Sequence, residues 1–205
     1  MKKIYTENDI EKFKCWLKEN LNEEKYIHSI GTMEQAVELA KKYIPQSENK
    51  IKVAALLHDC AKCFTIDSLK EHIANNEEIS KEFDLSNYKT YHAPVGCCFA
   101  RENFEIDDEE ILNAIKYHTV GRVGMSDFEK IVFLSDKIEP KTRNAEYRNM
   151  ILKELDKDNG LNRAVLLCFK TTIKSLLDRN MTISSESVNA YNYILSLVVN
   201  LYVFC

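Results

Sequence analysis

Apolar residues along the chain recur at steps of three and four, the period of an amphipathic helix, and no stretch alternates apolar and polar residues for long enough to predict a strand. Only five glycines and three prolines interrupt these runs. The pattern therefore predicts an all-α fold. The expected helices span about 7–20, 22–44, 49–59, 67–75, 94–103, 107–118 and 126–138, with a polar loop over 76–89 and two or three further helices between 146 and 204.

The expected starts of two of these helices have the residue spacing of an N-terminal cap. Asp107 with Glu110, and Ser126 with Glu129, have a capping residue followed three positions later by an acid. Each pair directly precedes an apolar run. We therefore expect a helix to begin at each of them.

The expected helix over 22–44 ends before Pro45 and carries a stripe that we expect to be buried, formed by Tyr26, Ile30, Met33, Val37, Ala40 and Ile44. His28 falls almost opposite this stripe, on a face whose small residues let another segment approach closely. A lone histidine in such a setting is more often a satisfied, half-buried side chain than a metal ligand. His28 alone therefore indicates no function.

The apolar run from Val53 to Leu57 ends abruptly in His58 and Asp59, where a buried core would be expected to continue. A buried carboxylate costs several kcal/mol unless it is paired or ligated, so Asp59 needs a cation. Lys62, one helical turn further on, is the structural candidate, and a metal ion is the functional one. The residues by themselves leave both interpretations open.

Three more residues are expected to turn inward. Pro94 suits the first turn of a helix, which puts His92 at the helix mouth, where unpaired amide groups favour an anion such as phosphate. His118 continues the apolar row of its helix, and Asp136 interrupts an otherwise apolar helix. The fifth histidine, His72, lies among charged residues on an expected solvent face, and we leave it out of the site.

The composition of the chain limits its partners. A length of 205 residues with 45% hydrophobic residues predicts a single domain over 1–205 with one buried core. A net charge of −4 gives no electrostatic footprint for nucleic acid or for an anionic membrane surface. The N-terminus is too polar for a secretory signal, and the longest apolar run, 193–205, is shorter than the roughly 20 residues that cross a bilayer. We expect a cytoplasmic protein whose last apolar run forms a helix on the core.

Seven cysteines at irregular spacing, in a chain without an export signal, predict reduced thiols. Cys60 and Cys63 have C-x-x-C spacing, but no second pair completes a four-thiolate zinc site and no strand-to-helix context suggests a redox motif. Metal or redox chemistry is therefore the less favoured interpretation of this pair.

The coincidence of six residues is more informative than any one of them. Four of the five histidines and two acids are expected to turn inward. Imidazole and carboxylate ligands together favour iron, manganese, zinc or cobalt, whereas magnesium favours all-oxygen sites. Such a metal lowers the pKa of a bound water and polarises phosphoryl oxygen. The candidate ligands are His28, His58, Asp59, His92, His118 and Asp136.

The order of these residues resembles a known signature. His28, the pair His58-Asp59 and Asp136 resemble the H…HD…D pattern of the HD-domain metal-dependent phosphohydrolases, an all-α superfamily. The sequences around them, Leu57–Lys62, His92–Gly96, Ile115–Gly121 and Leu134–Pro140, resemble the YqeK family of bacterial symmetrical bis(5'-nucleosyl)-tetraphosphatases, over 21–192 of the chain. That family cuts diadenosine tetraphosphate into two ADP. The resemblance implies an HD-domain helical bundle that acts on a dinucleoside polyphosphate or binds a nucleoside diphosphate.

The resemblance also implies a role for each residue of the site. A first metal, iron in the manner of the family, would be held by His28, His58, Asp59 and Asp136. Two further histidines would either complete a second metal site bridged by Asp59 or contact substrate phosphate, namely His92 and His118. The residues expected to act in catalysis are Asp59, Lys62, His92 and His118. The expected substrate contacts are Lys25, Lys62, His92, His118, Thr119, Gly121, Lys137 and Arg143.

Two positions depart from the family pattern and bear on substrate affinity more than on metal binding. Lys25 stands where an arginine is expected, and the arginine expected soon after Glu139-Pro140 comes only at Arg143. Two alternative functions stay open. One is an HD phosphohydrolase that acts on deoxynucleotides or cyclic nucleotides. The other is a non-catalytic nucleotide-binding module, which would be expected to have lost ligands, and this chain has lost none.

Overall fold

The computed structural model describes residues 4–83, 85 and 87–199, and every regular element within these residues is helical. The all-α prediction is therefore confirmed. The α-helices are α1 (Glu7–Asn20), α2 (Glu23–Tyr43), α3 (Glu48–Leu57), α4 (Ile66–Ala74), α5 (Glu77–Glu82), α6 (His92–Asn103), α7 (Glu109–Tyr117), α8 (Asp127–Ile138), α9 (Ala145–Leu155), α10 (Gly160–Asp178) and α11 (Ser185–Val199). The short 3-10 turns are η1 (Pro45–Ser47), η2 (Cys60–Cys63) and η3 (Tyr88–Thr90).

Side-chain caps explain where the helices begin. Ser126 and Glu129 form the expected capping box at α8, each side chain bonding the backbone of the other residue. At α7 the prediction was wrong by one residue, because the side chain of Asp108, not that of Asp107, accepts a hydrogen bond from the amide of Glu110. Either acid suits a cap by type, so the spacing did not distinguish them.

The segment 76–89, expected to be a polar loop, contains the short helix α5. Asn76 caps this helix by accepting hydrogen bonds from two amides of its first turn. Ile79 is the one buried residue over 77–81, where burial is described, and belongs to a small hydrophobic cluster with Leu69 and Ile73 of α4. A single buried residue gives no apolar period, and for this reason the helix was not predicted.

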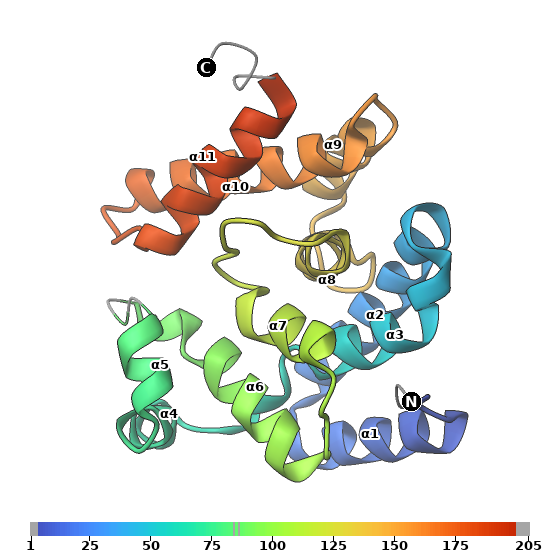
Figure 1. Ribbon diagram of the computed structural model, residues 1–205, viewed down its shortest axis with the longest axis vertical. Helices are drawn as coiled ribbons and strands as arrows, with labels where there is room; N and C mark the ends of the chain where they lie inside the picture. The colour runs from blue at the N-terminus through green and yellow to red at the C-terminus, as the bar shows by residue number, and fades with distance from the viewer. Residues whose placement is uncertain (1–3, 84, 86, 200–205) are drawn as a thin grey trace.

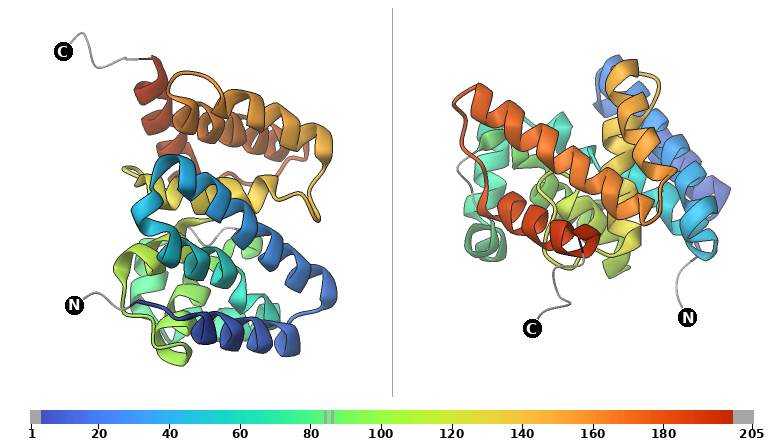
Figure 2. Two further views of the ribbon diagram at one scale, coloured as in Figure 1. Left: turned by 90° about the vertical axis from the view of Figure 1, so that its right-hand side faces the viewer. Right: turned by 90° about the horizontal axis from the view of Figure 1, so that it is seen from above.

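The helices are arranged around α8 (Figure 1). α9, α10 and α11 pack together at one end of the molecule, and α8 lies beside them in contact with α9 and α10. On its other sides α8 contacts α2, α3 and α7, while α6 packs against α7 and η2. Figure 2 shows that the central helices separate α1 from the α9–α11 layer. The main hydrophobic cluster includes residues of both α1 and α11, and the single-domain organisation over 1–205 stays a prediction.

The buried face of α2 differs from the stripe that the sequence predicted. Two residues of that stripe are buried, Met33 and Ala40, but four are only half-buried, Tyr26, Ile30, Val37 and Ile44. The opposite face is buried throughout, at His28, Thr32, Ala36 and Leu39. Small side chains let α2 pack closely against both α3 and α8. This packing encloses His28, so the side chain is buried as its place among the inward-turned residues predicts, and not half-buried as a lone histidine on such a face more often is.

No helix in the described part of the chain is long and apolar enough to span a membrane. The apolar run over 193–205 is helical as far as Val199 in α11, and its remainder lies outside the described residues. The described cysteines are free thiols, as expected, and Cys205 lies outside them. Burial raises the pKa of Cys60 and Cys63, which keeps both thiols protonated and disfavours a metal-binding role.

Candidate metal centre

The six residues that were expected to turn inward meet at one place in the core. They are His28 in α2, His58 and His118 at the C-terminal caps of α3 and α7, Asp59 just before η2, His92 at the start of α6 and Asp136 in the last turn of α8. All six are buried, and the most exposed of them, His92, is only 7% exposed. Residues distant in sequence therefore form a single polar cluster inside an apolar core.

One carboxylate oxygen of Asp59, Oδ2, faces the first group of side chains. His58 Nε2 lies 3.3 Å from this oxygen and His28 Nε2 lies 3.6 Å from it. Asp136 Oδ1 lies 3.0 Å from His28 Nε2 and 3.7 Å from His58 Nε2. These atoms surround one point, and they belong to the four residues that the sequence suggested for a first metal.

The other carboxylate oxygen of Asp59, Oδ1, faces the second group. His92 Nε2 lies 3.2 Å and His118 Nε2 lies 3.3 Å from it, and the two nitrogens are 3.2 Å apart. Asp59 Oδ1 is buried and makes no hydrogen bond. A buried carboxylate oxygen without a hydrogen bond is costly. This oxygen is therefore placed to bind a cation together with the two histidines.

Backbone carbonyl groups fix the orientation of two of the imidazole rings. His58 Nδ1–H donates to the carbonyl oxygen of Ala55, and His118 Nδ1–H donates to that of Ile115, each over 2.7 Å. In both cases the acceptor lies three residues earlier, in the last turn of the helix. The Nδ1 proton thus points away from the centre, which leaves Nε2 as the nitrogen that can bind a metal.

His28 is oriented by a side chain instead. Its Nδ1–H donates over 3.1 Å to Oε1 of Glu139, a residue that is 0% exposed. The Nε2 lone pairs of His28 and His58 then point toward each other across 3.3 Å and toward carboxylate oxygens. Acceptors that face one another need a cation between them. The donor set of imidazole nitrogen and carboxylate oxygen fits a transition metal.

Three cationic side chains surround the two carboxylates. Lys62 Nζ lies 2.6 Å from Asp59 Oδ2, Lys137 Nζ lies 2.9 Å from Asp136 Oδ2, and Arg143 Nη2 lies 2.6 Å from Asp136 Oδ1. Burial by itself raises the pKa of a carboxyl group, but these cations and the neighbouring imidazoles hold the pKa of both acids well below its usual range. Both acids are therefore ionised at neutral pH.

His58 and His118 differ in charge although their rings lie 4.9 Å apart. Burial lowers the pKa of both imidazoles. For His58 the adjacent carboxylates of Asp59 and Asp136 outweigh burial and raise the pKa to about 9, whereas the pKa of His118 falls to about 4. At pH 7 His118 is therefore neutral, and a proton competes with a metal ion for Nε2 of His58.

The other cations expected to contact substrate lie beside the centre. Lys25 Nζ donates to the carbonyl oxygen of Lys62 over 2.9 Å, which holds these two lysines together. Arg143 Nη2 also lies 3.1 Å from His28 Nε2, so its guanidinium group touches the ligand atoms themselves. The side chains of Lys62 and Arg143 are 31% and 37% exposed, so both can be reached from solvent.

The turn that follows His118 contains the other two expected contacts. The hydroxyl oxygen of Thr119 is buried and makes no hydrogen bond. Gly121 has a φ of +68°, and a Cβ at this position would overlap the ring of Phe169. Backbone conformation and packing therefore explain Gly121 without a substrate, whereas Thr119, the residue after His118, has a buried hydroxyl without a hydrogen bond.

Two residues of the centre were not predicted from the sequence. Glu139 lies at the C-terminal cap of α8 and accepts hydrogen bonds from the amides of Lys141 and Thr142 as well as from His28. Gly31 lies directly beside its carboxylate. A signal was present, because a glycine in the interior of a helix one turn after His28 indicates a close approach by another segment.

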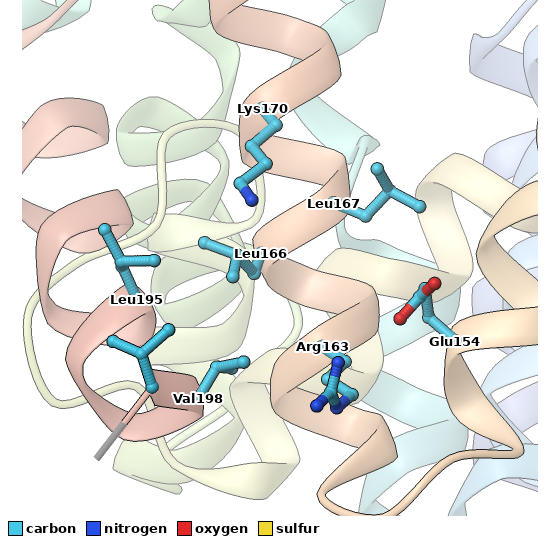
Figure 3. Close-up of a pocket in the computed structure, with 8 residues that line it drawn as sticks. Glu154, Arg163, Leu166, Leu167, Lys170, Leu195 and Val198 are labelled. Carbon is cyan, nitrogen blue, oxygen red and sulfur yellow. The ribbon is translucent and has the colours of Figure 1, made fainter. Parts of the chain in front are cut away.

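A separate hollow of about 300 Å³ lies between α9, α10 and α11 (Figure 3). Leucine and valine side chains form much of its wall, together with the charged groups of Glu154, Arg163 and Lys170. None of the six residues of the metal centre lines it. His72 is exposed on α4, as expected from its charged neighbours.

The helical fold and the clustered histidines and acids define the class of this protein, which is the HD domain. The family model "HD domain" matches residues 26–141, a range that contains all six residues of the centre. Within this class the chain belongs to the family of the symmetrical bis(5'-nucleosyl)-tetraphosphatases, which confirms the family resemblance seen in the sequence.

Two relatives and one solved structure support this membership. The chain is 33% identical to "Bis(5'-nucleosyl)-tetraphosphatase, symmetrical" of Bacillus subtilis, over 88% of this chain and 94% of that protein. It is 36% identical to the protein of the same name from Halalkalibacterium halodurans, over 87% of this chain and 93% of that protein. A crystal structure of a predicted HD superfamily hydrolase involved in NAD metabolism, from Clostridium acetobutylicum, matches with a TM-score of 0.81 and 33% identity over 95% of this chain and 100% of that one.

Proposed function

We propose that this protein hydrolyses bis(5'-nucleosyl) tetraphosphates symmetrically, so that diadenosine tetraphosphate gives two molecules of ADP. The observation that carries the proposal is the meeting of two ligand sets at the two oxygens of Asp59. Family membership supports the choice of substrate, because the relatives from B. subtilis and H. halodurans bear this activity in their names. The substrate class is a dinucleoside polyphosphate.

We assign a first metal to one set of residues, His28, His58, Asp59 and Asp136. A second metal is assigned to Asp59, His92 and His118. Iron is the ion that we propose first for this mixture of nitrogen and oxygen donors, and manganese, cobalt and zinc share the preference. A metal bound there supplies an activated water and polarises a phosphoryl oxygen. Elemental analysis of the purified protein identifies the ion and its stoichiometry.

The lysine and arginine side chains beside the metal centre offset the negative charge of the tetraphosphate. A tetraphosphate carries several negative charges that repel an incoming nucleophile, and fixed cations reduce this repulsion most as charge builds up in the transition state. Lys62 and Arg143 lie at the ligand atoms and are partly exposed, so each can contact a phosphate. Lys25 and Lys137 extend the positive charge on either side. We propose Lys62 as the strongest of these contacts, because Asp59 needs it less as a partner when a metal is bound.

The start of α6 is a second place for phosphate. This helix begins at His92 and has no side-chain cap, so the positive end of the helix dipole favours an anion there, although Pro94 contributes no amide hydrogen. We place the terminal phosphate of one nucleoside diphosphate half between this helix end and the ligand sets. Water can then reach only the phosphorus at the boundary of that half. Thr119, with its free hydroxyl next to His118, is a further contact for the same phosphate.

The products test this placement. Metal-loaded protein is incubated with diadenosine tetraphosphate in water enriched in heavy oxygen, and the nucleotides are separated and weighed by mass spectrometry. We expect ADP as the sole product, with the label in ADP. AMP plus ATP would refute the placement. Parallel incubations with deoxynucleoside monophosphates and cyclic nucleotides test the other HD activities, and tight binding of the tetraphosphate without turnover would indicate a nucleotide-binding module.

A further inference from the structure

We infer that Glu139 is a positioning residue of the metal centre, which holds His28 in the tautomer and orientation that metal binding requires. Gly31 is a glycine because the carboxylate of Glu139 occupies the space beside it. The inference rests on the metal centre of the proposed function and adds two residues to it. Glu139 follows Asp136 by three residues at the end of α8. One helix end thus supplies a ligand and also the group that orients a ligand on another helix.

The carboxylate of Glu139 is held on both of its oxygens. Oε2 accepts a hydrogen bond from the amide of Lys141 over 2.6 Å, and Oε1 accepts one from the amide of Thr142 over 3.0 Å. The hydroxyl of Thr142 also donates to Oε1. With two amides and a hydroxyl fixing its position, the carboxylate can move little. Its Oε1 is therefore a rigid acceptor for the proton on His28 Nδ1, which lies 3.1 Å away.

The hydrogen bond to Glu139 determines which imidazole nitrogen of His28 carries the proton. A neutral imidazole carries one proton, and the nitrogen that carries it cannot bind a metal. An acceptor at Nδ1 keeps the proton there and keeps the Nε2 lone pair pointed at Asp136 and Asp59. Without that acceptor the proton can move to Nε2, and the ring can rotate away from the other ligands. Metal affinity at the first site then falls.

Gly31 provides the space for this contact. A Cβ built on Gly31 would overlap Oε2 of Glu139 and lie 3.1 Å from its Cδ and 3.3 Å from Cγ of Lys141. A glycine in a helix interior destabilises the helix relative to alanine, so its presence in the middle of α2 needs a reason. The close approach of the buried carboxylate is that reason. Gly31→Ala therefore displaces Glu139 without altering any functional group.

Two variants test the inference, Glu139→Gln and Gly31→Ala, with Mn²⁺ as the probe ion. The amide of glutamine has one acceptor oxygen, so it can serve His28 or the Lys141 amide but not both. Metal-free protein is titrated with Mn²⁺ at equilibrium. The electron paramagnetic resonance signal of the free Mn²⁺ then gives the affinity of each site. We expect both variants to weaken Mn²⁺ binding at the first metal site by about 10–100-fold. Nitrogen-15 NMR of the metal-free protein should show the His28 proton on Nδ1 in the wild type and distributed over both nitrogens in the variants.

Two matched controls separate positioning from stability. Glu129→Gln also removes a buried carboxylate, at the opposite end of the same helix, where Glu129 is 3% exposed and bonds the amide of Ser126 and the side chain of Arg122. Gly96→Ala also fills a helix glycine, but there the nearest atoms to a Cβ lie at an ordinary 3.6 Å. Neither control should change Mn²⁺ affinity or the tautomer of His28, whatever it does to the melting temperature.

The outcomes distinguish this inference from the proposed function. If wild-type protein binds no Mn²⁺, iron, cobalt or zinc, the metal centre itself is wrong. If wild-type protein binds metal and both Glu139→Gln and Gly31→Ala bind it equally tightly, with His28 unchanged in tautomer, Glu139 is only a helix cap and the inference is overturned. Should either variant fail to fold, Thr142→Val replaces it, because this exposed substitution removes one donor that fixes Glu139. That variant should then weaken Mn²⁺ binding, and unchanged affinity would count against the inference.

Discussion

Replacing Lys62 with methionine separates a structural role for this side chain from a role in substrate binding. Lys62 Nζ lies 2.6 Å from Oδ2 of Asp59, which is 0% exposed, so the lysine balances a buried charge. Removing one partner of a buried ion pair costs about 3–5 kcal/mol. The side chain of Lys62 is 31% exposed, and water screens part of the interaction. In metal-free protein we therefore expect a loss of about 3 kcal/mol, which for a chain of this size lowers the melting temperature by about 6–12 °C.

Saturating metal should change this result. A metal ion bound to Asp59 supplies the balancing charge, so the same substitution should then cost less than about 1 kcal/mol of stability, as for an exposed pair. Catalysis should suffer instead. A hydrogen bond between a charged donor and a phosphate contributes about 1.5–3 kcal/mol. Its loss reduces kcat/KM for diadenosine tetraphosphate by about 10–150-fold.

The assay compares melting temperature with and without metal, and kcat/KM per folded molecule. Lys130→Met is the matched control, because Lys130 pairs with Asp127 at the same three-residue spacing over 2.9 Å, and this ion pair includes no residue of the centre. Its melting shift should not depend on metal, and its kcat/KM should equal that of the wild type. If Lys62→Met melts as early with metal as without it, and retains full activity, Lys62 is a structural partner of Asp59 and our assignment is wrong.

Asp59→Ala should lose both metals in elemental analysis, because each ligand set loses an oxygen; retention of a full complement would refute the shared role. His92→Ala and His118→Ala should slow the formation of ADP while one metal per chain remains bound, and loss of all metal would contradict two separate sets. Asp108→Asn should lower stability at pH 7 by about 1.5–3 kcal/mol, since Lys50 Nζ lies 2.5 Å from Asp108 Oδ2. Burial raises the pKa of Asp108, but its hydrogen bond with Lys50 holds that pKa below the usual value. The stabilisation by this pair is therefore complete above about pH 4 and is lost as the pH falls through the pKa of Asp108 in the folded state. Urea titrations of the wild type and the variant from pH 7 to pH 2 should show that their difference in stability vanishes in acid.

The sequence predicted the centre because its residues break a local rule. His58 and Asp59 directly follow an apolar helix and Asp136 interrupts another, at positions where a core residue is expected, and such an interruption can be recognised without knowing the fold. The capping box at Ser126 and Glu129 could be predicted for the same reason, since both partners lie within four residues of each other. In each case the informative pattern is local. The interaction that explains the pattern is local for the capping box but joins distant segments for Asp59 and Asp136.

What the sequence did not predict depends on contacts between distant segments. Glu139 and His28 lie 111 residues apart, and no spacing rule connects them. The buried face of α2 was assigned to the larger side chains, whereas close packing against α3 and α8 favours the smaller ones. The period of a helix identifies an apolar face. It does not tell which of two faces meets the closer neighbour.

The three oriented histidines show why Glu139 is needed at one of them. The last four carbonyl groups of a helix have no partner within the helix. His58 and His118 lie directly after α3 and α7, and each uses one of these free carbonyls, three residues back, to hold its Nδ1 proton. His28 lies inside α2, where the neighbouring carbonyls already accept the hydrogen bonds of the helix. A histidine inside a helix therefore requires an acceptor from another segment, and Glu139 provides it through the space that Gly31 leaves.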